Sequence, residues 1–216
     1  MQSKRFWSAL FQARAALNDL AESEIAALKR RYGVPVRRSF RADFLEFECN
    51  LVRQSTCKGR NHDITCFIEA ADGYVVIQKH AYANTGIYRA PSGGANVGED
   101  LETAAKREMH EETGLDIELV RFVLDVTLDI RCQDGAIHWR SLVFLARKVS
   151  GEMTPLDTHE VYDIAVMTHD QLLNEVNPLM EATGWGGFRY RAFLTREFFK
   201  SLDRHKRLLN EEPNKD

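Results

Sequence analysis

The stretch Pro91–Leu115 reads PSGGANVGEDLETAAKREMHEETGL, a glycine-rich turn followed by a helical pattern. Asp100 precedes that pattern and is a favourable N-cap residue, because its carboxylate can accept a hydrogen bond from an early helical N–H. Gly114 stands where a helix commonly ends in the left-handed conformation. We therefore predict one well-capped helix over residues 101–113.

Three carboxylates follow the apolar stripe of this predicted helix. At about 100° per residue, Glu108, Glu111 and Glu112 fall in the same sector as Leu101 and Ala104. Like charges gathered there repel one another and lose hydration, which is costly unless a cation compensates. A hard divalent cation is the simplest compensation, and a solvated face paired with neighbouring basic residues is the alternative.

The whole stretch carries a longer pattern, G-x5-E-x7-R-E-U-x-E-E-x-G-U, in which U is a bulky apolar residue. Every fixed position matches: Gly93, Glu99, Arg107, Glu108, Met109, Glu111, Glu112, Gly114 and Leu115. The seven invariant letters match a given window by chance on the order of once in 10⁸ or more rarely. The chain therefore resembles the Nudix hydrolases in this box, and over about residues 62–200 in the order of its strands and helices.

This resemblance implies a fold and a metal site. The fold would be α+β, namely the Nudix α/β/α sandwich with a mixed sheet, whereas periodicity by itself indicates only α+β with a mixed sheet. Glu108, Glu111 and Glu112 would bind Mg²⁺, or alternatively Mn²⁺, helped by a backbone carbonyl of Ser92 or Gly93. The implied reaction is metal-assisted hydrolysis of a phosphoanhydride bond.

The catalytic roles around the metal are only partly settled by the resemblance. Arg107 would orient a ligand carboxylate through its guanidinium fork, with a solvated pair to Glu111 as the alternative. Members of the family take their general base from the box, which here includes Glu112, or from a later loop, where Glu160 is the best candidate. Glu99 would be a further ligand or the base. A surface glutamate without a role is the alternative for Glu160.

Substrate contacts are harder to predict. Arg89 and Arg140 are candidates for phosphate contacts and Tyr88 and Trp139 for stacking on a base, although surface ion pairs and core packing are the commoner fates of such residues. The proline that many ADP-ribose hydrolases carry about fifteen residues beyond the box is absent, as is the SQPWPFPxS signature of NADH pyrophosphatases. The small residue Ser92 in the turn resembles the ADP-ribose type.

The composition is that of an ordinary globular protein, with 216 residues of which 44% are hydrophobic and 28% charged. The sequence predicts an N-terminal helix-and-strand extension over 1–60 for packing or dimerisation, a catalytic domain over 61–209 and a polar tail over 210–216. A net charge of −3 offers no general attraction for nucleic acid. Without a long apolar run or a secretory leader, we expect no membrane segment and a cytoplasmic location.

The remaining pattern predicts the other elements. Helices are expected over 3–31, from near Asp170, and over 188–209; strands are expected over 45–51, 63–70, 74–80, 122–131, 137–147 and 161–168. The four cysteines form no C-x-x-C pair, so we expect reduced, mostly buried thiols; a zinc site at Cys49, Cys57, His62 and Cys66 is a weaker alternative.

Four functions are compatible with these observations. The favoured one is a hydrolase of nucleoside diphosphates linked to another moiety, such as nucleotide sugars or ADP-ribose. A pyrophosphohydrolase that clears noncanonical nucleoside triphosphates is the second. A nucleotide-sensing protein that kept the fold without the activity is the third, and it is disfavoured because the box retains all its glutamates. A hydrolase of nucleic-acid ends is the fourth.

Overall fold

The computed structural model describes residues 20, 22–57 and 59–211. The helices are α2 (Glu22–Tyr32), α3 (Glu46–Cys57), α4 (Leu101–Thr113), α5 (His169–Gln171), α6 (Asn177–Ala182) and α7 (Gly186–Glu211), with the short turns η1 (His80–Tyr82) and η2 (Leu172–Val176). Most of the helix predicted over 3–31, and residues 212–216 of the predicted tail, lie outside the described residues.

One mixed sheet organises the chain. Its strands are β1 (Val36–Asp43), β2 (His62–Ala70), β3 (Gly73–Lys79), β4 (Ser92–Gly93), β5 (Leu115–Cys132), β6 (Gly135–Gly151) and β7 (Val161–Met167). The order is β1-β5-β6-β2-β3-β7, with β4 paired to β2. The β1–β5 and β2–β6 pairs are parallel, whereas β5–β6, β2–β3 and β3–β7 are antiparallel. The strands predicted over 63–70 and 74–80 form the β2–β3 hairpin across the favourable turn residues Asp72 and Gly73, and those over 122–131 and 137–147 form the β5–β6 hairpin across Asp134 and Gly135.

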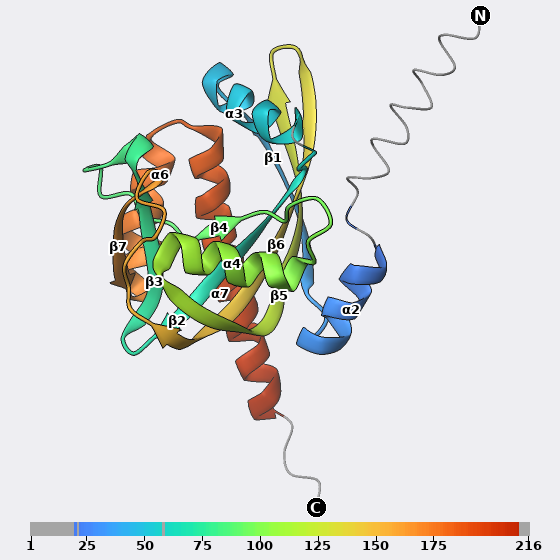
Figure 1. Cartoon of the computed structure of the whole chain (residues 1–216), viewed down its shortest axis with the longest axis vertical. Helices are drawn as coiled ribbons and strands as arrows, with labels where there is room; N and C mark the ends of the chain where they lie inside the picture. The colour runs from blue at the N-terminus through green and yellow to red at the C-terminus, as the bar shows by residue number, and fades with distance from the viewer. Residues whose placement is uncertain (1–19, 21, 58, 212–216) are drawn as a thin grey trace, which may run out of the picture.

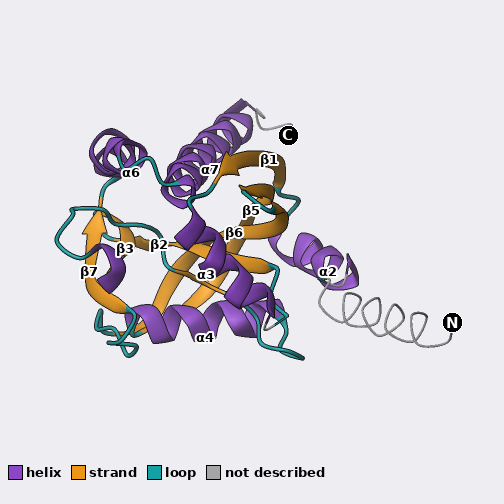
Figure 2. Cartoon of the chain, turned by 90° about the horizontal axis from the view of Figure 1, so that it is seen from above, coloured by secondary structure: helices purple, strands orange, loops and turns teal. Residues whose placement is uncertain are grey.

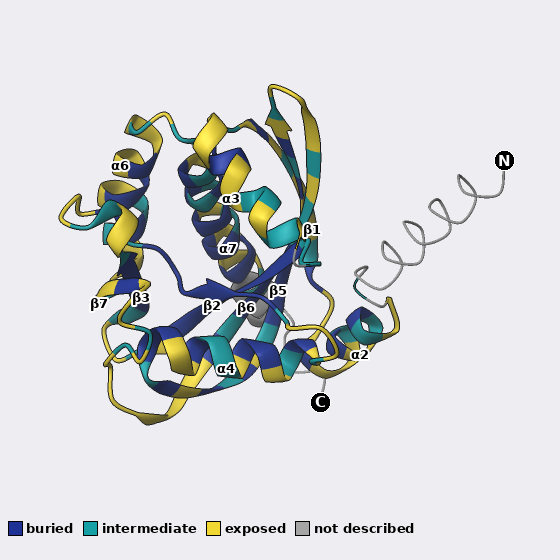
Figure 3. Ribbon diagram, turned by 45° about the horizontal axis from the view of Figure 1, so that its top comes forward, coloured by how far each residue is buried: buried dark blue, intermediate teal, exposed yellow. Residues whose placement is uncertain are grey.

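Helices cover both faces of this sheet (Figures 1 and 2). Ile25 of α2 and Met109 of α4 belong to one buried cluster, while Met180 of α6 and Phe198 of α7 belong to the other. The inner sides of α4 and α7 are buried and their outer sides exposed (Figure 3). Two apolar layers on either side of one sheet make an α+β sandwich, which confirms the predicted fold class.

The strand predicted over 45–51 is wrong, because residues 46–57 form helix α3. Of the alternating residues that suggested a strand, Leu45, Phe47 and Leu51 are 46%, 44% and 59% exposed and do not face a core. In α3 the buried positions are Glu48 and Cys49. The strand of this region lies earlier, as β1, and its parallel pairing with β5 builds residues 36–43 into the same sheet as the rest of the chain.

The prediction that the cysteines are reduced thiols is wrong for two of them. Cys49 and Cys132 form a disulfide, while Cys57 is a free exposed thiol and Cys66 a free buried one. The two bonded residues are 83 positions apart, and they come together because α3 lies against the tip of the β5–β6 hairpin (Figure 1). With Cys49 in a disulfide, the weaker alternative of a zinc site is also wrong.

A carboxylate ties α3 to the start of α7 as well. Glu48 is 7% exposed and accepts hydrogen bonds from the backbone N–H groups of Gly186 at 3.1 Å and Gly187 at 2.9 Å. Unpaired N–H groups at a helix start favour a negative charge.

Among the described helices, none is long and apolar enough to cross a membrane.

Candidate active site

The predicted capped helix is confirmed as α4, with both of its ends as expected. Asp100 accepts a hydrogen bond from the N–H of Thr103 at 2.9 Å, and Gly114 ends the helix with φ 72° in the left-handed region. Leu101, Ala104 and Met109 are buried on its inner face. This packing fixes the rotation of α4 and therefore determines where its glutamates point.

Arg107 connects the turn before α4 with the helix itself. Its guanidinium donates to both oxygens of Glu99 at 2.8 Å, to the carbonyl of Gly94 at 3.1 Å and to Glu111 at 3.0 Å. The hydrogen bond from Arg107 lowers the pKa of Glu99, and the carboxylate of Glu99 also accepts from the N–H of Asn96 at 2.9 Å. Glu99 is thus held in the turn as a partner of Arg107.

Glu112 is the most deeply buried carboxylate of the box, at 2% exposed. It accepts a hydrogen bond from the N–H of Ser92 at 2.7 Å. Lys79 lies 3.1 Å and Arg89 3.7 Å from its other oxygen. Two cations and one backbone donor therefore compensate a charge that would otherwise be costly to bury.

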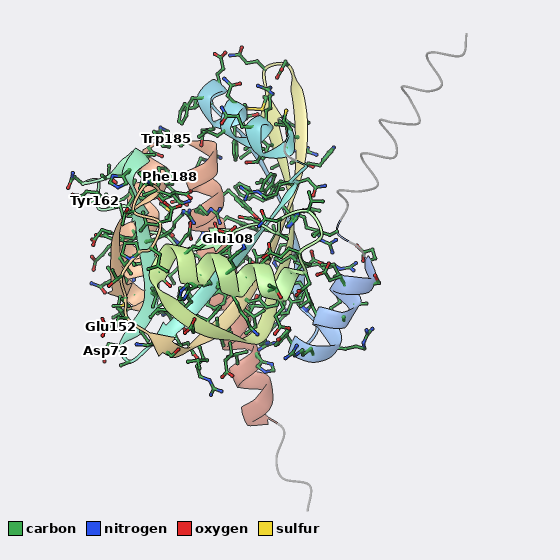
Figure 4. The ribbon with its side chains drawn as sticks, viewed as in Figure 1. Asp72, Glu108, Glu152, Tyr162, Trp185 and Phe188 are labelled. Carbon is green, nitrogen blue, oxygen red and sulfur yellow. A yellow bond between two sulfur atoms is a disulfide. The ribbon has the colours of Figure 1, made fainter. Side chains whose placement is uncertain are left out.

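Glu108 lies one turn earlier, at the edge of α4 that faces α3 and α7 (Figure 4). It accepts a hydrogen bond from the N–H of Gly94 at 3.2 Å, and its pKa is raised by burial. A Cβ added at Gly93 would overlap the Glu108 carboxylate, so only glycine permits this approach of backbone to carboxylate. Burial outweighs the opposing effect of Arg107, whose Nη1 lies 3.1 Å from the Glu108 carboxylate, so the net shift of the Glu108 pKa is upward.

The carboxylate and carbonyl oxygens of the box are the type of ligand that a hard divalent cation requires. They are not close enough together in this structure to form a complete coordination shell. Within the described part of the chain, no three His, Cys, Asp or Glu side chains are close enough together to hold a metal ion. Glu111 is half-exposed and turned towards Arg107. The buried oxygens of Glu108 and Glu112 and the nearby turn backbone nevertheless fit Mg²⁺ in ligand type.

A cavity of about 260 Å³ opens beside the box. Its wall includes Ser92, Gly93 and Glu108 at one end. Lys79 also lines it and forms ion pairs with both Glu112 and Glu160. Glu160 is thus brought from the segment before β7 to the same cavity as the box, whereas Glu99 is not among the lining residues.

Two of the four predicted substrate contacts line the cavity, and two do not. Arg89 and Trp139 line the cavity: Arg89 donates to Ser92 Oγ at 2.9 Å, and Trp139 Nε1 donates to Asp63 at 3.1 Å. Tyr88 and Arg140 lie outside the lining. Tyr88 donates to Asp163, and Arg140 forks onto Asp125 at 2.8 and 2.9 Å.

Several polar residues of this cavity were not predicted from the sequence, and Lys79, Asp63 and Arg191 are the charged ones that contact other residues of the site. Arg191 donates to Asp63 at 2.9 Å, to Thr65 at 3.0 Å and to Ser92 Oγ at 3.1 Å. Helical spacing places Arg191 on the apolar side of α7, and an arginine on a buried stripe is the signal that identifies it. Asp63 near the start of β2 and Lys79 at the end of β3 carry no comparable signal.

Comparison with known proteins gives consistent family matches. The model of the NUDIX domain matches residues 59–184. The NAD-capped RNA hydrolase NudC of Haemophilus influenzae (strain PittGG) is 37% identical over 102 residues, covering 47% of this chain and 36% of the relative. Its counterpart in Vibrio vulnificus (strain CMCP6) is 29% identical over 104 residues, covering 46% and 35%.

Among solved structures, that of a UDP-X diphosphatase aligns with 87% of this chain and 73% of its own, with 16% identity and a TM-score of 0.48. The curated relatives are longer proteins. This chain spans about a third of the length of those that it matches.

Proposed function

The chain belongs to the NUDIX domain family, and from this premise we propose that it hydrolyses the phosphoanhydride bond of a nucleoside diphosphate linked to another moiety. ADP-ribose and nucleotide sugars are the favoured types. One observation carries the proposal: a single cavity brings the box carboxylate Glu108 and the turn residue Gly93 together with Lys79, Arg89 and Arg191. Those cations suit the charge of a diphosphate.

A divalent cation, Mg²⁺ or Mn²⁺, belongs to this proposal. Glu108, Glu111 and Glu112 would hold it, with a carbonyl of Ser92 or Gly93. When bound, the ion would neutralise charge on the diphosphate and lower the pKa of the attacking water. The rigid part of the site is supplied by Arg107, which holds the turn carbonyl of Gly94 and the Glu111 carboxylate in one network.

We assign the general base to Glu160 in preference to Glu99. Glu160 is half-exposed at the cavity wall, where water and a substrate can reach it. Both oxygens of Glu99 accept from Arg107, which leaves Glu99 as a positioning residue for that guanidinium. The Lys79 ammonium, between Glu112 and Glu160, would fix the direction of the base and contact a phosphate oxygen.

A second candidate substrate is suggested by the relatives, which are named as NAD-capped RNA hydrolases. The NAD cap is itself a nucleoside diphosphate linked to another nucleoside, so the chemistry is the same. The net charge of −3 still predicts no extended contact with the RNA body. Hydrolysis of nucleoside triphosphates and ligand sensing without turnover remain alternatives.

The test is a substrate panel with product identification. Purified protein with Mg²⁺ is incubated with ADP-ribose, UDP-glucose, NAD, NAD-capped RNA and noncanonical triphosphates. Two phosphorylated products from a diphosphate compound are the expected result. Release of pyrophosphate from a triphosphate would instead favour the second hypothesis, and absence of all turnover would favour a sensing protein.

The matched variant is Glu111→Gln combined with Glu112→Gln. These substitutions keep the shape of both side chains and remove two charges, so turnover is expected to disappear while circular dichroism still shows a folded protein. Full activity of the double variant would contradict the assignment of these glutamates to the metal. Lys106→Ala is the control, because Lys106 forms a surface pair with Glu102 at 2.7 Å on the same helix.

A further inference from the structure

The cavity at the box continues away from it into a larger hollow of about 810 Å³. The two share wall residues, among them Leu51, Lys79 and Arg191, so they form one cleft. One side of the hollow is α3, and the other is the segment around η1 together with the start of α7. A ligand held at Glu108 can therefore extend towards α3 without leaving the cleft.

The chemistry of the lining changes along this cleft. Glu108 lines only the cavity at the box, and Phe47 and Trp185 line only the larger hollow. Leu51, Lys79 and Arg89 line both, so charged groups reach from the box to the middle of the cleft and aromatic rings stand at its far end. Phe47 and Leu51 are among the exposed large apolar residues, at 44% and 59%. Exposed apolar side chains gathered in a concave wall mark a binding site.

The aromatic side chains at the far end are packed against one another. Trp185 stacks on Phe188 with ring centroids 5.0 Å apart and planes at 8°, and the edge of Phe47 meets Trp185 at 4.8 Å and 72°. Figure 4 shows Trp185 and Phe188 at the start of α7, at the same end of the molecule as α3. A flat heteroaromatic ring is the ligand group that suits such a surface.

Two sets of contacts anchor this wall to the rest of the fold. The Cys49–Cys132 disulfide fixes α3 to the β5–β6 hairpin, and Glu48 joins α3 to the N–H groups of Gly186 and Gly187. A wall that is already in place saves the ordering cost of binding. Phe47 and Leu51 lie before the matched NUDIX segment 59–184, and Trp185 follows it, so the wall is a property of this chain outside the matched segment.

We propose that α3 and the start of α7 form the subsite for the nucleobase of the substrate, with Phe47, Leu51 and Trp185 as its specificity-determining residues. The proposal rests on the proposed function, because it takes the diphosphate to be bound at the box. The two ends of the cleft would therefore have separate tasks. The charged end acts on the diphosphate, and the aromatic end selects the nucleoside attached to it.

The first experiment compares two substrates and a pair of leucines. Leu51→Ala and Trp185→Ala are assayed on ADP-ribose and on its base-free counterpart, two riboses joined through their 5-oxygens by a single diphosphate. Loss of a stacking partner is expected to raise KM for ADP-ribose about tenfold in Trp185→Ala, with kcat and the base-free substrate little affected. Leu45→Ala is the control: Leu45 is 46% exposed, similar to Leu51, and lies outside both cavities.

A second measurement does not depend on turnover. Calorimetric titration with AMP, and with ribose 5-phosphate as the base-free probe, is made on the wild type and on Phe47→Ala, whose exposed side chain can be removed without opening the core. AMP is expected to bind the wild type at least tenfold more tightly than ribose 5-phosphate, and the variant should lose most of that difference.

The outcomes separate the two proposals. Equal KM values for ADP-ribose and the base-free substrate, with Trp185→Ala unchanged on both, would overturn the subsite and leave the proposed function standing. If no diphosphate is hydrolysed but Phe47→Ala and Trp185→Ala weaken AMP binding, the subsite is supported and the proposed function falls. An equal effect of Leu45→Ala and Leu51→Ala would also overturn the subsite.

Discussion

At the scale of single residues, the two candidate bases differ in what their oxygens contact. Glu99 has both oxygens occupied by the Arg107 fork at 2.8 Å. Glu160 stands at the cavity wall beside Lys79 and is 52% exposed. A base must be reachable by the water that it activates. The surroundings of the two glutamates therefore support our proposal that Glu160 is the base and Glu99 a positioning residue, although the sequence presents them as equivalent candidates.

Glu160→Gln is expected to lower kcat by about 10²–10⁴-fold, because an amide cannot accept the proton from water. Glu99→Gln is expected to lower it less, through misplacement of Arg107, by about 10–100-fold. Steady-state kinetics on the substrate identified by the panel measure both. The control is Glu152→Gln, since Glu152 is exposed and does not line the cavity at the box. The reverse order of the first two effects would return the base to Glu99.

At the scale of elements, the stability of helix α4 depends on the glycine that ends it. Gly114 has φ 72°, and a Cβ there would overlap the backbone carbonyl oxygens of Glu152 and Thr154. Gly33 follows α2 with φ 86° and has nothing within 4 Å of its added Cβ. The two glycines thus share the backbone strain and differ only in the overlap.

Gly33→Ala is expected to cost about 1–2 kcal/mol in the free energy of unfolding, the usual penalty for a left-handed alanine. Gly114→Ala should cost several kcal/mol, because backbone atoms must also move, and it should lower activity by displacing the end of α4. Chemical denaturation measures the two free energies. Equal costs at both positions would contradict this account of the close contact at Gly114.

The Cys49–Cys132 disulfide, which joins α3 to β5, is the second feature at the scale of elements. Combining Cys49→Ser with Cys132→Ser is expected to lower the free energy of unfolding by about 2–5 kcal/mol, since the bond closes a loop of 83 residues. Thermal unfolding with and without a dithiol reductant measures the same loss in the wild type. Cys57→Ser is the control, because Cys57 is a free exposed thiol. A reductant that leaves the wild-type midpoint unchanged would argue against a stabilising role for the bond.

At the scale of the whole molecule, the acidic box joins α4 to β4 and β3 through Ser92 and Lys79. A cation bound there would stabilise all of these elements together. Mg²⁺ at a hundred times its dissociation constant is expected to raise the unfolding midpoint by about 5–10 °C. Differential scanning fluorimetry measures the shift, and a chelator should reverse it. A similar shift in the Glu111→Gln, Glu112→Gln variant would locate the bound cation elsewhere.

The sequence by itself determined the parts of this protein that depend on local order along the chain. The caps Asp100 and Gly114 and the two hairpins follow from spacing and turn chemistry, and all appear in the structure. Local hydrogen bonds and a helical or alternating period are enough to specify them. Of the three glutamates predicted on the apolar stripe, Glu108 and Glu112 point inward, whereas Glu111 is 47% exposed and paired with Arg107.

Only the tertiary structure decided how distant segments meet. Phe47 and Leu51 alternate as in a strand, yet α3 forms because Glu48 and Cys49 find partners far along the chain, at Gly186, Gly187 and Cys132. The same holds for Lys79, which contacts Glu112 and Glu160 only once β3 is packed beside the box. Such contacts depend on the packing of elements across the sheet, which no short-range period encodes.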